Sequence, residues 1–258
     1  MIEISNPVIE MEAAISGMRN AKKSWEKSDS ISCFCNLEQF NKYCLNRALQ
    51  TKCPPNQVKN KVAWYKDNAI LDARCFDPTT KPMFKAFFLG ENDLKLAKTL
   101  SKAGTDHGKF LRQITVSFNI TAPLYWWKEF DTYKVGTTAN STSTMHTLSN
   151  EKITIDCFSF DGVLNRKDPD WTKDLIEIIN LCEKTRQKYL KTKDKAYWRR
   201  LIQMLPSAWM QERTITLNYA VLKNMYNARK NHKLTEWQTF CAFIEKLPYA
   251  KELILCED

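Results

Sequence analysis

The sequence predicts an α+β fold, with one helix-rich domain over residues 1–258 and a small, mostly antiparallel sheet. Most segments repeat apolar residues at the spacing of a helix, whereas residues 113–121 alternate apolar and polar side chains, as a half-buried strand does. Hydrophobic residues make up 43% of the chain and only six residues are Gly, so the chain can bury a core and offers few linkers. Together these observations favour a single mixed domain.

The expected helices can be followed in chain order from their apolar faces. In the first of them, Ile9, Ala13 and Met18 recur along one face. A long helix is expected to begin at Asp168 and Pro169, because Asp is a good N-cap and Pro fits the first helical position. Helices are expected over residues 9–18, 36–49, 92–103, 168–190, 197–205, 218–229 and 234–247, with a shorter one from Pro123.

Two segments are expected to be strands. Within residues 113–121, the apolar residues Ile114, Val116 and Phe118 alternate with polar neighbours. The same alternation recurs over residues 153–160. The short loop of small hydroxyl and amide residues between these segments is expected to be an ordinary solvated connection.

The chain carries a formal net charge of +10, which suggests a polyanionic partner, either nucleic acid or phosphate-bearing small molecules. Positive residues are spread along the sequence, and the densest stretch runs from Lys184 to Arg200. That stretch is the best candidate for an acidic partner. Solvated helix faces are favoured over a nucleic-acid groove, and no nucleic-acid partner is expected.

Nine cysteines are scattered from Cys33 to Cys256, an odd number without a secretory signal at the start of the sequence. They are expected to be reduced thiols of a cytoplasmic protein. Zinc or another metal is not expected, because no Cys-x-x-Cys pair occurs and the histidines stand far from the thiols in sequence. No run approaches the roughly 18 apolar residues of a membrane span, so no membrane association is expected.

Residues 122–146 form the first stretch of chemical interest: a strand end, an Ala-Pro step, a helix and then the loop of hydroxyl and amide residues. Glu129 shares a helical stripe with Trp126, Phe130 and Tyr133. A carboxylate among aromatic rings on an inward face is unusual, because burying it requires partners.

A second stretch, residues 205–232, places an amide and a guanidinium on one helix. Asn218 and Arg229 are about three helical turns and roughly 16 Å apart, with Leu222 and Met225 between them. This stripe could line an elongated ligand. Alternatively, Arg229 only compensates the partial charge at the helix C-terminus.

These two stretches resemble the signature region and the C-terminal substrate-and-flavin segment of the flavin-dependent thymidylate synthases, also called thymidylate synthase complementing proteins. The His-containing turn Gly104-Thr105-Asp106-His107 is similar as well, and the resemblance is strongest over residues 92–247. It implies that family's fold and a reductive methylation of dUMP to dTMP. Methylenetetrahydrofolate would donate the carbon and reduced FAD the hydride, with NADPH reloading the flavin. It also implies a homotetramer with sites at subunit junctions.

The resemblance also implies roles for individual residues. Arg229 would contact the uracil ring and stabilise negative charge on it, and Ser143 would approach the nucleotide as a second catalytic residue. Glu129 stands where the family has a glutamine that faces the nucleotide. Charge for the phosphate would come from neighbouring positions, namely Arg199, Arg200 or His146, in place of family arginines that this chain lacks. Flavin contacts would come from Tyr133, Lys134, Asn140, Ser141, Asn218, Asn224 and His232.

Several family positions are changed in this chain. The tripeptide matching the family's Arg-His-Arg is Thr132-Tyr133-Lys134, Met145 and Ile202 stand at positions of arginines, and Gln113 stands at that of a histidine. Two alternatives therefore stay open: altered chemistry at C5 of a pyrimidine nucleotide, such as hydroxymethylation, and a non-catalytic descendant that binds nucleotide or nucleic acid. A cysteine-dependent thymidylate synthase is not expected. A dinucleotide-binding Rossmann enzyme is not expected either, because the sequence contains no Gly-x-Gly-x-x-Gly.

Overall fold

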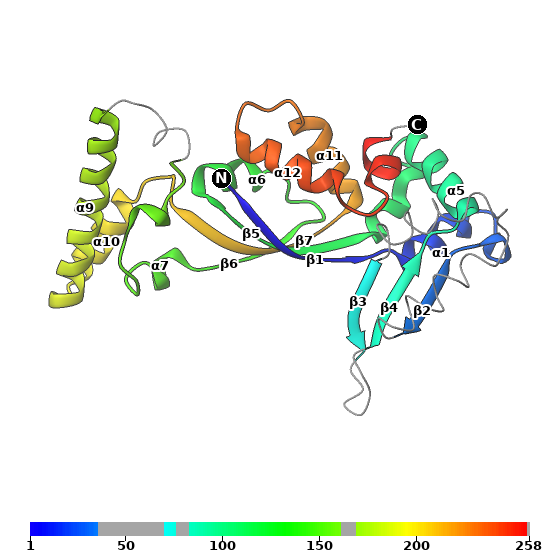
Figure 1. Cartoon of the computed structure of the whole chain (residues 1–258), viewed down its shortest axis with the longest axis horizontal. Coiled ribbons are helices and arrows are strands. Elements are labelled where there is room, and N and C mark those ends of the chain that lie inside the picture. The colour runs from blue at the N-terminus through cyan, green and yellow to red at the C-terminus, as the bar shows by residue number, and fades with distance from the viewer. Residues whose placement is uncertain (36–69, 76–82, 161–168, 257–258) are drawn as a thin grey trace.

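The computed structural model describes residues 1–35, 70–75, 83–160 and 169–256. The helix expected over residues 36–49 and the N-cap expected at Asp168 lie outside these ranges. The described chain forms two antiparallel sheets with helices packed around them, and a helical arm at one end (Figure 1). The helix-rich α+β class with a small antiparallel sheet is confirmed.

A four-stranded sheet crosses the middle of the molecule in the order β1 (Glu3–Glu10), β5 (Thr115–Pro123), β7 (Met210–Asn218), β6 (Thr138–Ser141). All three pairings are antiparallel. The strand expected over residues 113–121 is β5, and its residues Val116, Phe118 and Ile120 are buried as the alternation predicts. Strands β1 and β7, in contrast, were not expected from the sequence.

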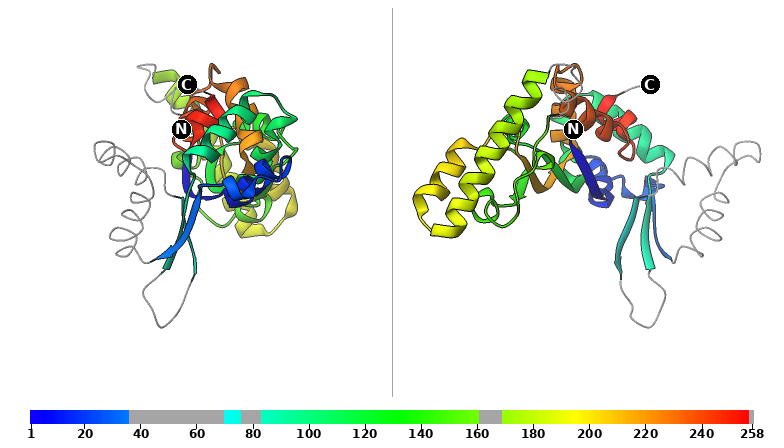
Figure 2. Two further views of the ribbon diagram at one scale, coloured as in Figure 1. Left: turned by 90° about the vertical axis from the view of Figure 1, so that its right-hand side faces the viewer. Right: turned by 60° about the vertical axis from the view of Figure 1, so that its left-hand side comes forward.

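A second sheet of three strands has the order β2 (Ile31–Cys35), β4 (Met83–Phe88), β3 (Ile70–Cys75) and is also antiparallel. In Figure 2 these strands extend away from the body of the molecule, at the end opposite the helical arm. Phe87 of β4 is buried in the main core and joins this sheet to the central region.

The helices expected within the described ranges are present with small shifts at their ends. The first begins after Ile9, which lies on β1, and the helix expected from Pro123 begins one residue later because Pro123 is its N-cap. No helix of the described residues is long and apolar enough to cross a membrane. The α-helices are α1 (Glu12–Asn20), α5 (Glu91–Lys102), α6 (Leu124–Phe130), α7 (Thr144–Thr147), α9 (Pro169–Thr192), α10 (Lys195–Met204), α11 (Tyr219–Arg229) and α12 (Thr235–Glu245). Shorter turns are the 3-10 helices η1 (Trp25–Lys27), η4 (His107–Gln113) and η5 (Ile155–Cys157) and the π-helical turn η6 (Lys251–Leu255).

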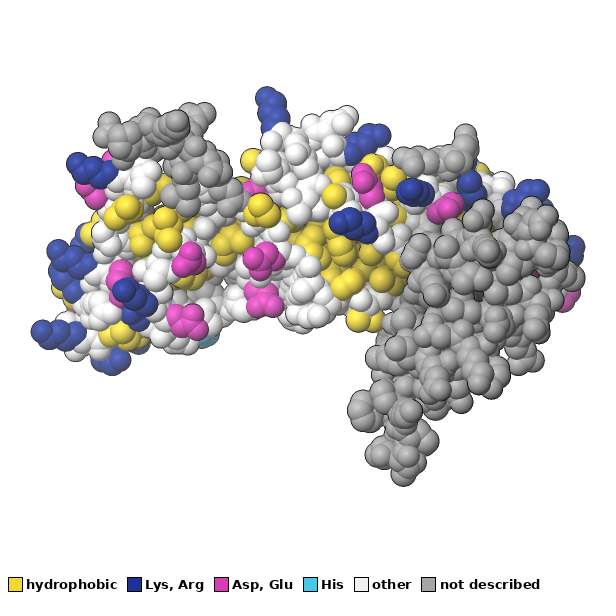
Figure 3. Space-filling view, in the orientation of Figure 1, with side chains coloured by type: hydrophobic (Ala, Val, Ile, Leu, Met, Phe, Trp, Pro, Cys, Tyr) yellow, Lys and Arg dark blue, Asp and Glu magenta, His cyan; other side chains and the backbone are white. Residues whose placement is uncertain are grey.

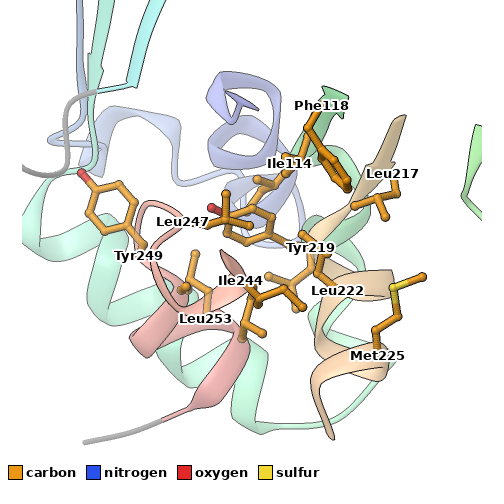
Figure 4. Packing of buried hydrophobic residues seen from close by; sticks show 14 of the residues in the cluster. Ile114, Phe118, Leu217, Tyr219, Leu222, Met225, Ile244, Leu247, Tyr249 and Leu253 are labelled. Atoms are coloured by element: carbon orange, nitrogen blue, oxygen red, sulfur yellow. The ribbon is translucent and has the colours of Figure 1, made fainter. Parts of the chain in front are cut away.

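The main hydrophobic core lies between the four-stranded sheet and helices α6, α11 and α12. Its largest fully buried side chains include Trp126, Trp127 and Trp237, and Trp126 packs between the other two at ring-centroid distances of 4.9 Å. Figure 4 shows Leu222 of α11 among the other side chains of this core, and both Leu222 and Met225 are fully buried members of it. The apolar face of α11 is thus used for packing.

A second, separate core holds the arm together. Helices α9 and α10 pack side by side, and Cys182 and Leu201 are buried with Leu148 and Phe158 from the preceding segment. The strand expected over residues 153–160 is wrong: the segment forms η5, and only Phe158 makes an isolated bridge, to Trp209. Its apolar residues pack onto the arm helices instead of covering one face of a sheet, as they would in a half-buried strand.

An ion pair on α9 also binds the segment before that helix, and its contribution to the stability of the fold should depend on pH. The Glu183 carboxylate accepts hydrogen bonds from Arg186 Nε (2.7 Å) and the backbone N–H of Ile153 (2.9 Å). The Arg186 hydrogen bond outweighs burial and lowers the pKa of Glu183 to about 2.

The variant Glu183→Gln is therefore expected to be less stable than wild type at neutral pH. A carboxyl group with a depressed folded-state pKa stabilises the fold above its unfolded pKa, and this contribution is lost as the pH falls through the folded value. The difference in urea midpoint between the two proteins should shrink as the pH falls from about 4.5 toward 2. The exposed Glu177→Gln on the same helix serves as the control, and an equal pH dependence in both variants would contradict the assignment.

Candidate functional site

A half-buried polar cluster forms where α6, α11 and α12 meet. We call it the Glu129 cluster: Glu129 at the end of α6, Tyr133 in the turn after it, Arg229 at the end of α11, His232, and Trp237 on α12. Strands β5 and β7 pair along their whole length, and helices α6 and α11 each follow the end of one of them. The fold thereby brings together side chains 100 residues apart in sequence.

Two donors converge on one carboxylate oxygen of Glu129, and a histidine ring nitrogen lies close to the same oxygen. Arg229 Nη1 lies 2.8 Å from Glu129 Oε2, and Trp237 Nε1 donates to the same oxygen at 2.9 Å. The His232 Nε2 atom lies 3.5 Å from that oxygen. Arg229 also donates from Nε to the Tyr133 hydroxyl at 2.9 Å, and its guanidinium carbon lies 4.7 Å from the centre of a Trp237 ring.

The cluster keeps a face toward solvent, since the side chains of Glu129 and Arg229 are 34% and 19% exposed. Within the part of the chain that the structure describes, no hydrogen bond to Glu129 Oε1 or from Arg229 Nη2 is recorded. An acceptor and a planar donor therefore stand side by side above aromatic rings. Such an arrangement can hold the polar edge of a flat ligand and place positive charge beside it.

The sequence-predicted nucleotide residues near α7 lie in a second, exposed group. The Ser143 hydroxyl caps the short helix α7 and lies 3.3 Å from His146 Nδ1. Arg200 is exposed on α10, which approaches α7 through a hydrogen bond from Trp198 Nε1 to the Met145 carbonyl oxygen (3.1 Å). Ser143, His146 and Arg200 thus face solvent beside the arm.

The flavin residues predicted on this side are also exposed. Asn140 and Ser141 lie on the edge strand β6, and Lys134 lies in the turn before it. The segment predicted to be a loop is therefore partly a strand, paired with β7. Thr142 continues this contact, because its backbone N–H donates to the Glu212 carbonyl oxygen at 2.9 Å.

Arg213 on β7 was not singled out by the sequence, although it connects these groups. Its guanidinium carbon lies 4.1 Å from the centre of a Trp127 ring, and Nη1 donates to Asp131 Oδ1 at 2.7 Å. Its Nε donates to Gln211 Oε1, and Gln211 in turn donates to the Thr142 carbonyl oxygen at 2.8 Å. Arg213 therefore holds the segment before Ser143 against the sheet. The sequence would have indicated Arg213 only if residues 210–218 had been predicted to form a strand.

A cavity of about 260 Å³ lies between η4 and α11. Asn224 lines it, as do Gly104 and Thr105 of the turn that the sequence singled out. Two cations also line it, Arg112 and Lys223, and none of the described residues that line it is acidic. These described lining residues are Ser101, Gly104, Thr105, Gly108, Leu111, Arg112, Ala220, Lys223, Asn224 and Asn227.

The two cations of this cavity differ in their bonding. Lys223 Nζ donates to the Ser101 hydroxyl (2.7 Å) and contacts Cys256 Sγ (3.0 Å), so it is anchored to the C-terminal turn. Arg112 is exposed, and no hydrogen bond or ion pair from its guanidinium is recorded among the described residues. A cavity with a fixed ammonium and an available guanidinium suits an anionic ligand group.

Asn218 does not line this cavity. Its Oδ1 accepts the backbone N–H of Val221 at 3.1 Å, so the side chain caps α11. Leu222 and Met225 are buried in the main core, and the hypothesis that the stripe from Asn218 to Arg229 lines one elongated ligand is therefore wrong. Asn218 ends that stripe as a cap and Arg229 ends it in the Glu129 cluster.

Comparison with known proteins supports the fold strongly and the sequence relationship weakly. No protein-family model matches the chain, and no curated protein matches it by sequence. Solved structures that match it over nearly its whole length include flavin-dependent thymidylate synthase ThyX from Helicobacter pylori complexed with FAD and dUMP, and a second structure of ThyX from the same organism with the same ligands. Their TM-scores are 0.57 and 0.59, each at 13% identity, covering 100% and 99% of this chain and 99% and 98% of theirs.

The chain therefore has the fold of the flavin-dependent thymidylate synthases. At 13% identity this similarity describes the fold alone. What the site does must be inferred from its own residues.

Proposed function

We propose that this protein binds FAD and a pyrimidine nucleotide and methylates dUMP reductively to dTMP. The observation that carries the proposal is the half-buried guanidinium of Arg229, held beside Glu129 on a fold whose similar structures contain FAD and dUMP. The sequence resemblance assigns Arg229 to the uracil ring independently of the fold comparison.

Arg229 would act by stabilising negative charge that develops on the pyrimidine, which makes C5 a better nucleophile. Tyr133 and Trp237 hold its guanidinium in a fixed direction, so little reorganisation is needed when the base binds. Glu129 would accept a hydrogen bond from the base through Oε1. When bound, reduced FAD would supply the hydride, with methylenetetrahydrofolate as carbon donor and NADPH as reductant.

The cavity beside Asn224 is our candidate for part of the FAD site. Its cations and amides suit a phosphate-bearing cofactor, and the lining contains no carboxylate to repel one. At about 260 Å³ it is smaller than the usual pocket for a drug-sized ligand, so it would hold only part of FAD.

The rest of the site would come from neighbouring protomers of a homotetramer in the cytoplasm. Apolar side chains on the surface of one protomer fit this assembly, since exposed apolar patches often mark contacts between chains. Ile176, Ile178 and Leu181 of α9 are each more than 40% exposed, as are Val135 and Met145. Exposed Ser143, His146 and Arg200 would then meet nucleotide bound between protomers.

The visible absorption spectrum of the purified protein, with and without added FAD, tests the proposal. Binding of FAD followed by binding of dUMP supports it, and the mass of the product from dUMP, methylenetetrahydrofolate and NADPH separates methylation from hydroxymethylation. A protein that takes up no FAD at any concentration would remove the proposed function.

The variant Arg112→Ala is expected to weaken FAD binding by roughly ten- to a hundredfold, the effect of losing one charge-assisted hydrogen bond. The exposed Lys95→Ala on α5 carries the same change of charge outside the cavity lining and should leave FAD affinity unchanged. Titration of FAD by fluorescence quenching measures both. Equal affinities of the two variants would show that the cavity does not hold the cofactor.

A further inference from the structure

The end of the helical arm carries a concentration of positive charge, of which the proposed function uses only Arg200. We call residues 184–200 the basic hairpin, since they comprise the last turns of α9, the connecting turn and the first turns of α10. The stretch contains eight Lys or Arg residues and a single carboxylate, that of Asp194. Seven of the cations are exposed: Lys184, Lys188, Lys191, Lys193, Lys195, Arg199 and Arg200.

Among the residues that the structure describes, no carboxylate is recorded in an ion pair with these exposed cations. Arg186, the buried member of the set, takes the nearby Glu183 as its partner. The Asp194 carboxylate is used as the N-cap of α10, where it accepts the backbone N–H of Ala196 at 2.8 Å. Within residues 184–200, all of them described, no ion pair is recorded for any of the seven.

The spacing of the cations works against helix stability. Lys184 and Lys188 on α9, and Lys195 and Arg199 on α10, stand four residues apart, where like charges repel and destabilise a helix. A partner that presents closely spaced negative charge would relieve this repulsion. A single small anion could not contact cations distributed over two helices.

The cations form a surface rather than a line. Lys184, Lys188 and Lys191 span roughly 10 Å along α9. Lys188 Nζ lies 5.5 Å from the centre of the Tyr197 ring, which brings this row against α10 and its own cations. Since one nucleic-acid strand carries a phosphate about every 3.4 Å, such a surface would face several phosphates at once.

Aromatic rings lie among the cations. Tyr189, Tyr197 and Trp198 are half-buried, and Lys193 Nζ lies 5.9 Å from the centre of the Tyr189 ring. Rings interleaved with positive side chains are typical of surfaces that follow a nucleic-acid backbone and contact unpaired bases. An acidic protein or an anionic lipid surface would not require them.

Figure 3 shows dark blue side chains gathered around the outer end of the arm, and Figure 1 places that end away from α11 and the Glu129 cluster. We propose that the basic hairpin is a binding surface for the phosphodiester backbone of nucleic acid. Binding there leaves the cavity beside Asn224 untouched, so the proposal does not rest on the proposed function.

Fluorescence anisotropy of labelled oligonucleotides, titrated with the full chain at several potassium chloride concentrations, tests this proposal. The probes are single-stranded DNA, single-stranded RNA and duplex DNA, each long enough to cover both helices. Binding to any of the three, with log affinity falling linearly against log salt, is expected, and the preferred probe identifies the kind of nucleic acid. Absence of binding at low salt would overturn the proposal.

A charge-matched pair of variants locates the surface. K188Q/K191Q/K195Q removes three cations of the basic hairpin, and K23Q/K95Q/K246Q removes three exposed cations elsewhere, leaving both proteins with the same net charge. For a single strand, the salt slope should fall by about two in the first variant and stay near wild type in the second. Equal losses in both would overturn the assignment, as would wild-type binding to anionic phospholipid vesicles with no binding to oligonucleotides.

Discussion

Replacing Asp93 with alanine is expected to destabilise the protein by about 3–5 kcal/mol, because it leaves the buried Arg19 charge without a partner. Asp93 on α5 is fully buried, and Arg19 Nη2 lies 2.6 Å from its Oδ1. Its other oxygen, Oδ2, accepts from the hydroxyl groups of Ser28 and Ser30, each at 2.6 Å. One carboxylate therefore joins α1, α5 and the segment that leads into β2.

Two comparisons separate this explanation from simple loss of packing. The variant Asp93→Asn keeps the shape and removes the charge, so it should also be destabilised, whereas Lys95→Ala on the same helix should have little effect. Removing both ionic partners together, as R19M/D93L, should recover part of the loss, since no charge is then buried alone. Urea unfolding measures all four, and a stable D93A protein would contradict the prediction.

The stability that Asp93 contributes should decrease as the pH falls. Burial of Asp93 disfavours its charged form, but the hydrogen bonds from Ser28, Ser30 and Arg19 outweigh burial, and the pKa of this carboxyl is lowered below its usual value. Its stabilising contribution is therefore present above the unfolded pKa of about 3.9 and is lost as the pH falls through the lower folded value. The gap between wild type and D93N should close in that acid range.

Replacing Arg229 with methionine is expected to weaken dUMP binding by about a hundredfold or more, since removing one member of a hydrogen-bonded charge pair costs 2–5 kcal/mol. Methionine preserves much of the side-chain length above Trp237. The neighbouring Lys230→Met, which is exposed, provides a control with the same change of charge. Isothermal titration with dUMP on the FAD-loaded protein measures both variants.

Glu129→Gln completes a double-mutant cycle with Arg229→Met. If the pair acts as a unit on the base, the double variant should lose much less affinity than the sum of the two single losses. Additive losses would show that Arg229 and Glu129 act separately. Unchanged dUMP affinity in R229M would refute the assigned role of Arg229 while leaving the fold as described.

Regular periodicity explains which parts of the fold could be predicted. Strand β5 and helices α5, α11 and α12 each carry an apolar face of the expected period, and the structure buries those faces in the main core. Strand β7 was missed because Gln211 and Arg213 occupy positions that carry no hydrophobic signal, although both make specific hydrogen bonds in the structure. The strand prediction for residues 153–160 failed for the opposite reason: these residues carry an apolar signal, but they pack onto α9 and α10 and form no sheet.

The site residues also fall into those that the sequence predicted and those that only the packing brings together. Resemblance of motifs indicated Glu129, Tyr133, Arg229 and His232 separately, and the structure brings these four into one cluster. The cavity cations Arg112 and Lys223 could not be predicted, because an isolated basic residue on a helix has no distinctive sequence context. Only the packing of η4 against α11 places them together, and the core of the domain determines that packing.

The division of apolar side chains into two clusters has a thermodynamic consequence. Leu148, Cys182 and Leu201 are buried within the arm, whereas the aromatic core lies over the central sheet. Each cluster can gain or lose its burial free energy with limited effect on the other, so local opening of the arm requires less free energy than global denaturation. A single midpoint temperature would then describe an average of two cooperative units rather than one all-or-none transition.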